Sequence, residues 1–335
     1  MTGPPEPRAP GGAAGVNTTA GPVPAERLGR TLIHEHLRSF SEPVRHQFPH
    51  LYDHGHELER AIEEVRRAQS HGVETIVDPA CMDLGRDAGF TLEVVAATGI
   101  RVVMATGIYG QHYTFLPHHF QNQTVDYLAD AFVHDVEVGI QGTAVRAGLI
   151  KVAVDAPGMT EDMEKVHRAA ARASRRTGVP IMAHSRPADR TGIVQLDLLA
   201  EEGVDPSRVL VAHSGDTDDF EYLERLLERG AWLGMDRYGT VVYLPDGRRN
   251  EVVAELCRRG HADRLMLSHD ACATVDWFPP ERIARARKRW NFGYLFEGVL
   301  PRLAELGVTE EQAATMLEGN PGRWLAPRPP EPDAR

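Results

Sequence analysis

Short, continuously apolar runs alternate along the chain with longer amphipathic stretches. The apolar runs have the length of strands, and most lack the in–out alternation of a half-exposed strand, which indicates burial on both faces. Eight such runs occur, at Thr31–Leu37, Thr75–Ala80, Val102–Gly107, Gly148–Asp155, Pro180–Ser185, Val209–Ser214, Trp232–Asp236 and Leu265–Asp270. Between them, apolar residues recur at helical spacing, as at Leu58, Ala61, Ile62, Val65 and Ala68. The pattern predicts eight consecutive βα units.

Eight βα units close naturally into a (β/α)8 TIM barrel of the α/β class, built as a single domain. An open, doubly wound sheet is the alternative, but the sequence offers no glycine-rich phosphate loop of the expected spacing. We expect the barrel over residues 16–327, with a disordered N-terminal tail at 1–15 and a C-terminal tail at 328–335, both rich in proline. The chain of 335 residues, 42% of them hydrophobic, suffices for one such core.

Charge and composition narrow the class of partner. The formal net charge of −11 argues against nucleic acid or an anionic membrane as the main partner. No apolar run approaches the ~18 residues of a membrane span, and the N-terminus does not resemble a signal peptide. Cys81, Cys257 and Cys272 lack the spacing of a metal or disulfide motif. We therefore expect a cytoplasmic protein that acts on a small molecule.

Ionisable residues stand at the end of almost every predicted strand. In a (β/α)8 barrel the carboxyl ends of the strands carry the catalytic groups. The strand-end residues are His34, His36, Asp78, Lys151, His184, His213, Asp236, Arg237 and Asp270. The sequence therefore predicts an active site at this end of the barrel.

His34 and His36 are two residues apart on the first predicted strand. Alternation sends both side chains to one face, here the barrel interior. Two converging imidazoles suit a metal ion, although a hydrogen-bonded pair of core histidines is the alternative for an isolated pair. The other strand-end groups favour the metal.

Lys151 lies within the otherwise apolar strand GLIKVAVD, and lysine occurs elsewhere only at Lys165 and Lys288. A buried ammonium is costly, so burial lowers its pKa. One interpretation is a lysine that extends its amine to solvent at the strand end. The other is that the neutral amine reacts with CO2 to form a carbamate, whose two oxygens can bridge two metal ions.

His184 and His213 close the fifth and sixth predicted strands in similar contexts, and Asp270 closes the eighth. Each histidine alone could be an ordinary core residue, whereas two in register resemble ligands. His269 points to the opposite face and is left out. The set suits zinc, and also cobalt, iron or manganese. Two such ions would share a hydroxide that attacks a carbonyl or phosphoryl centre.

These motifs resemble a known family. GRTLIHEHL, GLIKVAVD, VPIMAHS, VLVAHSGDTDD, LGMDRYG and LMLSHDACATVDW together are similar to the phosphotriesterase-like lactonases, which belong to the phosphotriesterase family of the amidohydrolase superfamily. The similarity runs from about residue 16 to 325. It implies a binuclear metal-dependent hydrolase and a homodimer.

The resemblance also assigns roles to individual residues. His34, His36 and Asp270 would hold a buried metal ion, and His184 and His213 a more exposed one. A carboxylated Lys151 and a hydroxide would bridge the two ions, and Asp270 would take the proton of the hydroxide. Asp216 would orient this network, or would instead be the N-cap of the following helix.

The resemblance further implies a subfamily. The segment at Arg237 is similar to that of lactonases that open N-acyl-homoserine lactones, where Tyr109 contacts the lactone oxygens, Arg237 lines the site and Trp277 walls the acyl channel. For Tyr109 and Trp277, ordinary packing at the barrel rim is the alternative. The basic loop 271–290 departs from the family and is expected to be compact or partly helical.

Several functions remain open at this point. The resemblance implies quorum-quenching lactonase activity with weak hydrolysis of paraoxon. The alternatives are a phosphotriesterase for organophosphates, or a hydrolase of other γ- and δ-lactones or esters. A barrel that binds ligands without turnover is disfavoured, because a binder does not need Lys151 in a buried strand.

Overall fold

The computed structural model describes residues 15–110 and 116–331. Its strands are β1 Val16–Thr18, β2 Gly21–Val23, β3 Arg30–Leu32, β4 Glu35–His36, β5 Val73–Asp78, β6 Arg101–Gly107, β7 Leu149–Ala153, β8 Ile181–His184, β9 Val209–Ala212, β10 Trp232–Met235, β11 Leu265–Leu267 and β12 Ala271–Cys272. Its α-helices are α1 Glu42–Gln47, α2 His54–Ser70, α3 Ala88–Thr98, α4 His118–Gln121, α5 Val125–Glu137, α6 Glu161–Thr177, α7 Thr191–Glu201, α8 Phe220–Glu228, α9 Asp246–Arg258, α10 Pro280–Ala286, α11 Leu300–Glu305, α12 Glu310–Ala314 and α13 Asn320–Leu325.

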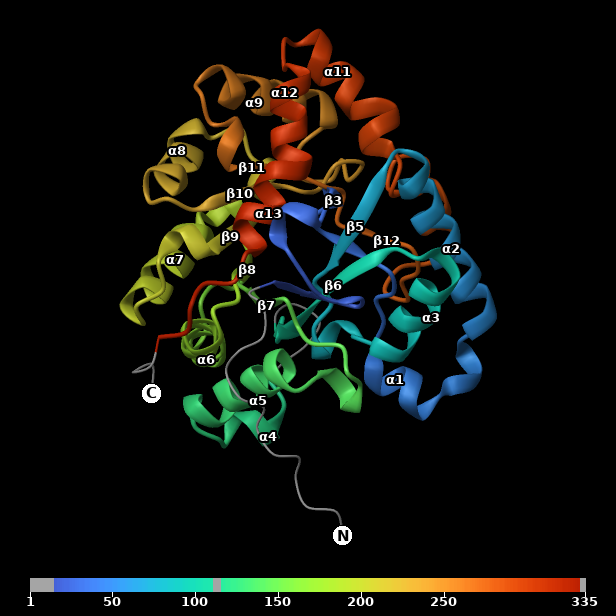
Figure 1. Ribbon diagram of the computed structural model, residues 1–335, viewed down its shortest axis with the longest axis vertical. Coiled ribbons are helices and arrows are strands. Elements are labelled where there is room, and N and C mark those ends of the chain that lie inside the picture. The colour runs from blue at the N-terminus through green and yellow to red at the C-terminus, as the bar shows by residue number, and fades with distance from the viewer. Residues whose placement is uncertain (1–14, 111–115, 332–335) are drawn as a thin grey trace.

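Eight parallel strands form the centre of the molecule, in the order β11-β10-β9-β8-β7-β6-β5-β3. The seam between the first and last of them is closed by the short extensions β4 and β12, which pair in parallel with Glu35 opposite Ala271 and His36 opposite Cys272. Helices surround the sheet on its outer face (Figure 1). The (β/α)8 barrel and all eight predicted strands are confirmed, with the first strand divided into β3 and β4.

The core has two parts, one inside the barrel and one between the sheet and the helices. The interior is filled by side chains from most of the strands, and Trp324 and Leu325 of α13 pack against them. The outer layer joins the opposite strand faces to the apolar faces of the helices. Burial on both sides explains why the strands are continuous apolar runs, and it leaves the carboxyl ends of the strands as the place for polar groups.

The loop 271–290 contains β12 and the helix α10, so the expectation of a partly helical loop is confirmed. Most of the predicted tails, residues 1–14 and 332–335, lie outside the described residues. Arg328 and Glu331, at the start of the predicted C-terminal tail, form backbone hydrogen bonds with Gly178 and Arg175. None of the helices in the described part of the chain combines the length and apolar character needed to cross a membrane.

Candidate active site

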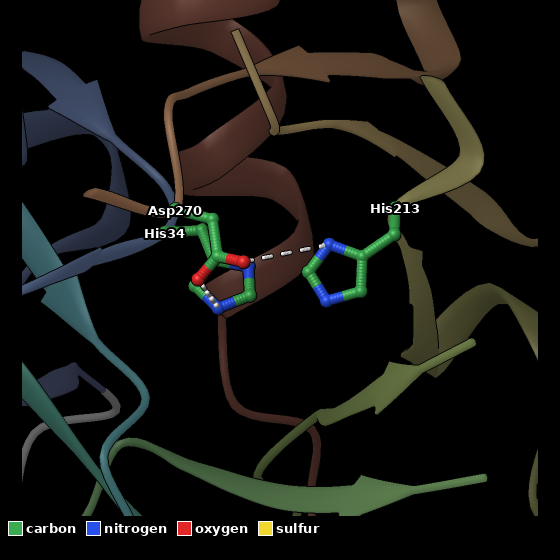
Figure 2. Close-up of side chains that lie close together, drawn as sticks. All are labelled: His34, His213 and Asp270. Carbon is green, nitrogen blue, oxygen red and sulfur yellow. Dashed lines mark ion pairs between the residues drawn. The ribbon is translucent and has the colours of Figure 1, made fainter. Parts of the chain in front are cut away.

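Three predicted metal ligands meet at the carboxyl end of the barrel. One nitrogen of His34, one of His213 and one carboxylate oxygen of Asp270 all lie within 4.8 Å of one another. The Asp270 carboxylate contacts both imidazoles (Figure 2), with Oδ1 3.3 Å from Nε2 of His34 and Oδ2 4.0 Å from Nδ1 of His213. Oδ1 of Asp270 is also 3.3 Å from Nε2 of His36. Donor atoms of three strands therefore converge on a space suited to a cation.

Lys151 points into this group from β7. Its Nζ lies 3.3 Å from Nε2 of His34, and the residue is only 1% exposed. Burial lowers the pKa of the Lys151 ammonium to about 8, despite the nearby Asp270 and Asp236 carboxylates. A large share of this amine is therefore neutral slightly above neutral pH, which carbamate formation requires.

His184 and His213 lie on the other side of the site. Nδ1 of His184 is 2.8 Å from Nε2 of His213, and both residues are buried. Burial lowers the pKa of His184 to about 4 and that of His213 well below its usual value. Both imidazoles are therefore neutral at physiological pH, as a metal ligand must be.

The structure brings a carboxylate behind each of the four histidines. Asp236 accepts from Nδ1 of His34 at 2.8 Å and from Nδ1 of His213 at 3.1 Å. A carboxylate only accepts, so Nδ1 carries the proton in both rings and the Nε2 lone pair faces the site. This is the arrangement that orients histidines on metal ions.

Asp78 and Asp155 stand behind the remaining two histidines. An oxygen of Asp78 is 3.3 Å from Nδ1 of His36, and an oxygen of Asp155 is 3.3 Å from Nε2 of His184. Burial lowers the pKa of His36, but the Asp270 and Asp78 carboxylates outweigh it and raise that pKa to about 9. His36 therefore holds a proton at neutral pH that a bound cation would displace, with the same carboxylates stabilising either positive charge. With Nε2 of His184 toward Asp155, its Nδ1 faces Nε2 of His213. The residues present therefore fit a pair of metal ions.

His213 and Asp270 have left-handed backbone conformations, with φ of 65° and 51°. Each follows the end of its strand directly or closely, since β9 ends at Ala212 and β11 at Leu267. Non-glycine residues adopt positive φ only at a cost, and such strain concentrates at functional sites. The backbone thus bends where these two side chains turn toward the site.

Arg237 connects Asp270 to Asp216. Its Nε lies 3.0 Å from Oδ2 of Asp270, and one of its terminal nitrogens lies 2.8 Å from Oδ2 of Asp216. Asp216 also accepts from Arg249 at 2.9 Å. The N-cap of α8 is Asp219, whose side chain accepts from the Tyr222 amide. The alternative role of Asp216 as that N-cap is therefore wrong, and Asp216 positions Arg237.

Tyr109 and Trp277 lie together at the rim. Both pack against the small cluster formed by Ala80, Cys81 and Leu84. The Tyr109 hydroxyl is 3.3 Å from Nε2 of His184. Burial raises the pKa of Tyr109 well above its usual value, so the phenol keeps its proton. Tyr109 thus combines rim packing with a polar contact at the site, and Trp277 packs against the same cluster.

The sequence interpretation left several site residues without a role. Asp236, Asp78 and Asp155 end strands or follow them, yet their contacts with histidines were not foreseen. Tyr243 was also missed, although the Arg237 guanidinium lies 4.8 Å from its ring centre. The signal available was the acidic residue beside each histidine-bearing strand, because neighbouring strand ends lie close together in a barrel.

Comparisons with known proteins agree with this geometry. The model of the phosphotriesterase family matches residues 14–325. The chain is 47% identical over 306 residues to an aryldialkylphosphatase of Saccharolobus solfataricus, covering 91% of this chain and 97% of that protein. It is 26% identical over 351 residues to an N-acetyltaurine hydrolase of Danio rerio, covering 92% and 97% of the two chains.

A solved structure shares the fold. The phosphotriesterase from Mycobacterium tuberculosis superimposes with a TM-score of 0.89 at 40% sequence identity, covering 92% of this chain and 98% of that chain.

Proposed function

The chain belongs to the phosphotriesterase family and is a metal-dependent hydrolase, and we propose that it opens lactone rings, with N-acyl-homoserine lactones as the preferred class and paraoxon as a weak substrate. The observation that carries the lactone assignment is the contact of the Tyr109 hydroxyl with His184. This contact puts a neutral hydrogen-bond donor beside the predicted metal centre. A lactone has two oxygens at its reacting carbon that can accept from such a donor.

The proposal includes two divalent ions, zinc or a similar metal. His34, His36 and Asp270 would hold one ion, and His184 and His213 the other. Nζ of Lys151 would attack the carbon of CO2 and lose a proton, and the resulting carbamate would supply one oxygen to each ion. When bound, such a pair activates water as a nucleophile and polarises the substrate oxygen.

Asp270 is the residue proposed to accept the proton from water. Burial raises the pKa of Asp270, but the neighbouring His34, His36 and Arg237 lower it well below its usual value, so the carboxylate is ionised at neutral pH, as a proton acceptor must be. The ion pair between Nε of Arg237 and Oδ2 of Asp270, at 3.0 Å, fixes the orientation of that carboxylate. Asp216 holds the other end of the guanidinium.

Substrate choice would depend on the rim. Tyr109 can donate to an oxygen of the lactone, and Arg237 can stabilise the negative charge that develops on the tetrahedral centre. Trp277 lies on the same apolar cluster as Tyr109 and would wall the acyl chain. The homodimer expected from the family stays a prediction.

The second candidate function is hydrolysis of organophosphate triesters. It is favoured by the 47% identity to an aryldialkylphosphatase. Lactones and triesters both react through centres that gain negative charge, so the same metal pair can serve both. The two functions differ in the shape of the rim rather than in the site beneath it.

A substrate comparison separates the candidates. We expect kcat/KM for homoserine lactones with C4 to C12 chains, or for δ-lactones, to exceed that for paraoxon. A paraoxon value tenfold or more above the lactone values would reject the lactonase assignment. A protein with under one metal per chain and no turnover of any of these substrates would indicate a binding barrel.

Lys151→Ala tests the metal bridge directly. We expect about two metals per chain in the native protein, and loss of metal and of most activity in the variant. Retention of both metals and of near-normal turnover would refute the proposed bridge.

A further inference from the structure

The segment of α10 and the residues that follow it is strongly basic in a chain with a net charge of −11. Its cations are Arg282, Arg285, Arg287, Lys288 and Arg289. None of the five forms an ion pair within the described residues, whereas surface arginines elsewhere, such as Arg168 and Arg259, are held by carboxylates. Within the described part of the fold, Arg282 lies over the Phe278 ring and Arg287 donates to a backbone carbonyl, but no carboxylate forms an ion pair with this segment.

A pocket of about 730 Å³ lies beside this segment, between α10 and α2. This volume falls in the range of small-molecule sites. No predicted metal ligand lines the pocket, so it is distinct from the catalytic centre. Figure 1 places α2 and β12, which precedes this segment, on the same side of the barrel. Its apolar walls include Phe40, Leu51, Val275, Phe278 and Ile283.

The carboxylates of the pocket are already bound by donors. Glu57 pairs with Arg38 and with Arg45. Asp276 accepts from the Tyr52 hydroxyl at 2.7 Å. These negative groups are therefore neutralised or hydrogen-bonded within the fold.

Asp53 is likewise engaged, because it accepts from the His56 amide as the N-cap of α2. Together with Glu57 and Asp276, it completes the acidic lining of the pocket.

Arg287 is the lining arginine that forms no ion pair within residues 15–110 and 116–331. One terminal nitrogen of its guanidinium donates a hydrogen bond to the Ala273 carbonyl at 2.8 Å. The other two lining arginines, Arg38 and Arg60, are both paired with carboxylates. Burial and the charge of Arg60 lower the pKa of Arg287, and the Glu64 and Glu63 carboxylates, which act in the opposite direction, do not outweigh them. An anionic ligand in the pocket would give the Arg287 guanidinium an ion-pair partner.

We propose that this pocket binds an amphipathic carboxylate, with its head group on Arg287 and its apolar chain along Phe40, Val275 and Ile283. A guanidinium binds a carboxylate by charge-assisted hydrogen bonds, and the apolar walls exclude a purely polar anion as the best ligand. If the proposed lactonase function holds, the ring-opened product belongs to this class whereas the neutral lactone does not. Substrate and product would then differ in their affinity for the pocket.

The test is a calorimetric titration of the metal-loaded protein with decanoate, and with decan-1-ol as the uncharged comparison, in the absence of lactone. We expect decanoate to bind at least tenfold more tightly than decan-1-ol. Arg287→Gln should weaken decanoate binding about tenfold or more. The matched control is Arg285→Gln, an exposed cation of the same helix outside the pocket, which should change the affinity less than about twofold.

A second variant keeps the arginine and supplies its counter-charge. Ile283→Glu places a carboxylate four residues before Arg287, within reach of its guanidinium, and should weaken decanoate binding as much as Arg287→Gln does. A carboxylate that bound only to the catalytic metals would be insensitive to both changes. Unchanged decanoate affinity in Arg287→Gln and Ile283→Glu would overturn the proposal. So would binding to phosphatidylglycerol vesicles without binding of decanoate, which would make the basic segment a membrane contact.

Discussion

Oδ2 of Asp236 lies 2.8 Å from Nδ1 of His34, on the first strand of the barrel. The other oxygen of the same carboxylate accepts from the His213 ring and from the His213 backbone amide. One buried side chain therefore orients one predicted ligand on each side of the proposed metal pair.

Asp236→Asn is expected to weaken both metal sites. An amide offers one acceptor and one donor, so one of the two histidines must lose its bond or change its tautomer. Loss of such a partner reduces metal affinity about 10- to 100-fold. Metal analysis after dialysis against a graded chelator measures the effect. Asp155→Asn alters the partner of one predicted ligand, His184, and should affect a single ion. Equal losses in the two variants would contradict the assignment.

The pKa of Lys151 gives a pH dependence for carbamate formation. Only the neutral amine reacts, and burial lowers the pKa of Lys151 from 10.5 to about 8. In metal-free protein at a fixed concentration of dissolved CO2, the initial rate of incorporation of ¹³C-labelled CO2 should rise up to about pH 8 and level off above it, because the neutral amine is the attacking group. Lysine with an ordinary pKa would keep gaining neutral amine until well above pH 10. NMR of the carbamate carbon measures this, with Lys151→Ala as the blank.

Arg237→Lys should lower turnover while leaving the metals in place. The arginine reaches Asp270 and Asp216 with different nitrogens, and a lysine cannot reproduce that fork. We expect kcat for the best lactone to fall about 10- to 100-fold, the scale of a lost charge-assisted pair. Steady-state kinetics combined with metal analysis distinguishes this outcome from metal loss, which would mean that Arg237 maintains the site rather than the reaction.

His167 predicts acid sensitivity outside the active site. It is fully buried, its Nδ1 donates to the Met163 carbonyl at 2.7 Å, and burial lowers its pKa to about 4. The unfolded chain, with a histidine pKa near 6.5, binds more protons between these values, so stability is full above pH 6.5 and falls as the pH drops toward 4. Between pH 7 and pH 5 the loss is about 2 kcal/mol.

Urea unfolding of the native protein and of His167→Gln at both pH values isolates this contribution. The free energy of unfolding should fall by about 2 kcal/mol less in the variant, because the titrating group is gone. Parallel pH curves for the two proteins would show that His167 is not responsible.

The sequence predicted the barrel because strand burial and helix amphipathicity leave a clear local pattern. It also predicted a shared position at the carboxyl end of the barrel for His34, His36, Lys151, His184 and His213, because strand order and side-chain alternation are enough to infer it. The structure places Asp270 among them, although it lies beyond the end of β11 with a left-handed backbone.

Strand order and alternation do not determine which side chains at neighbouring strand ends form contacts. Alternation shows which face Asp236 occupies, but not that its two oxygens reach His34 and His213, because that depends on barrel tilt and closure. The pairing of Asp216 with Arg237, rather than with α8, is equally a matter of three-dimensional packing. The substrate rim is least predictable, since loops have no repeating pattern.

The seam between β4 and β12 has a consequence for how the protein is made. His34 and His36 leave the ribosome early, whereas Asp270 and the strand that closes the barrel beside them follow more than two hundred residues later. During synthesis these two histidines therefore cannot share an ion with their aspartate partner until the segment that contains Asp270 has emerged. Metal binding across this junction would therefore be a late step in folding. A chain that stops before Asp270 could not complete the site.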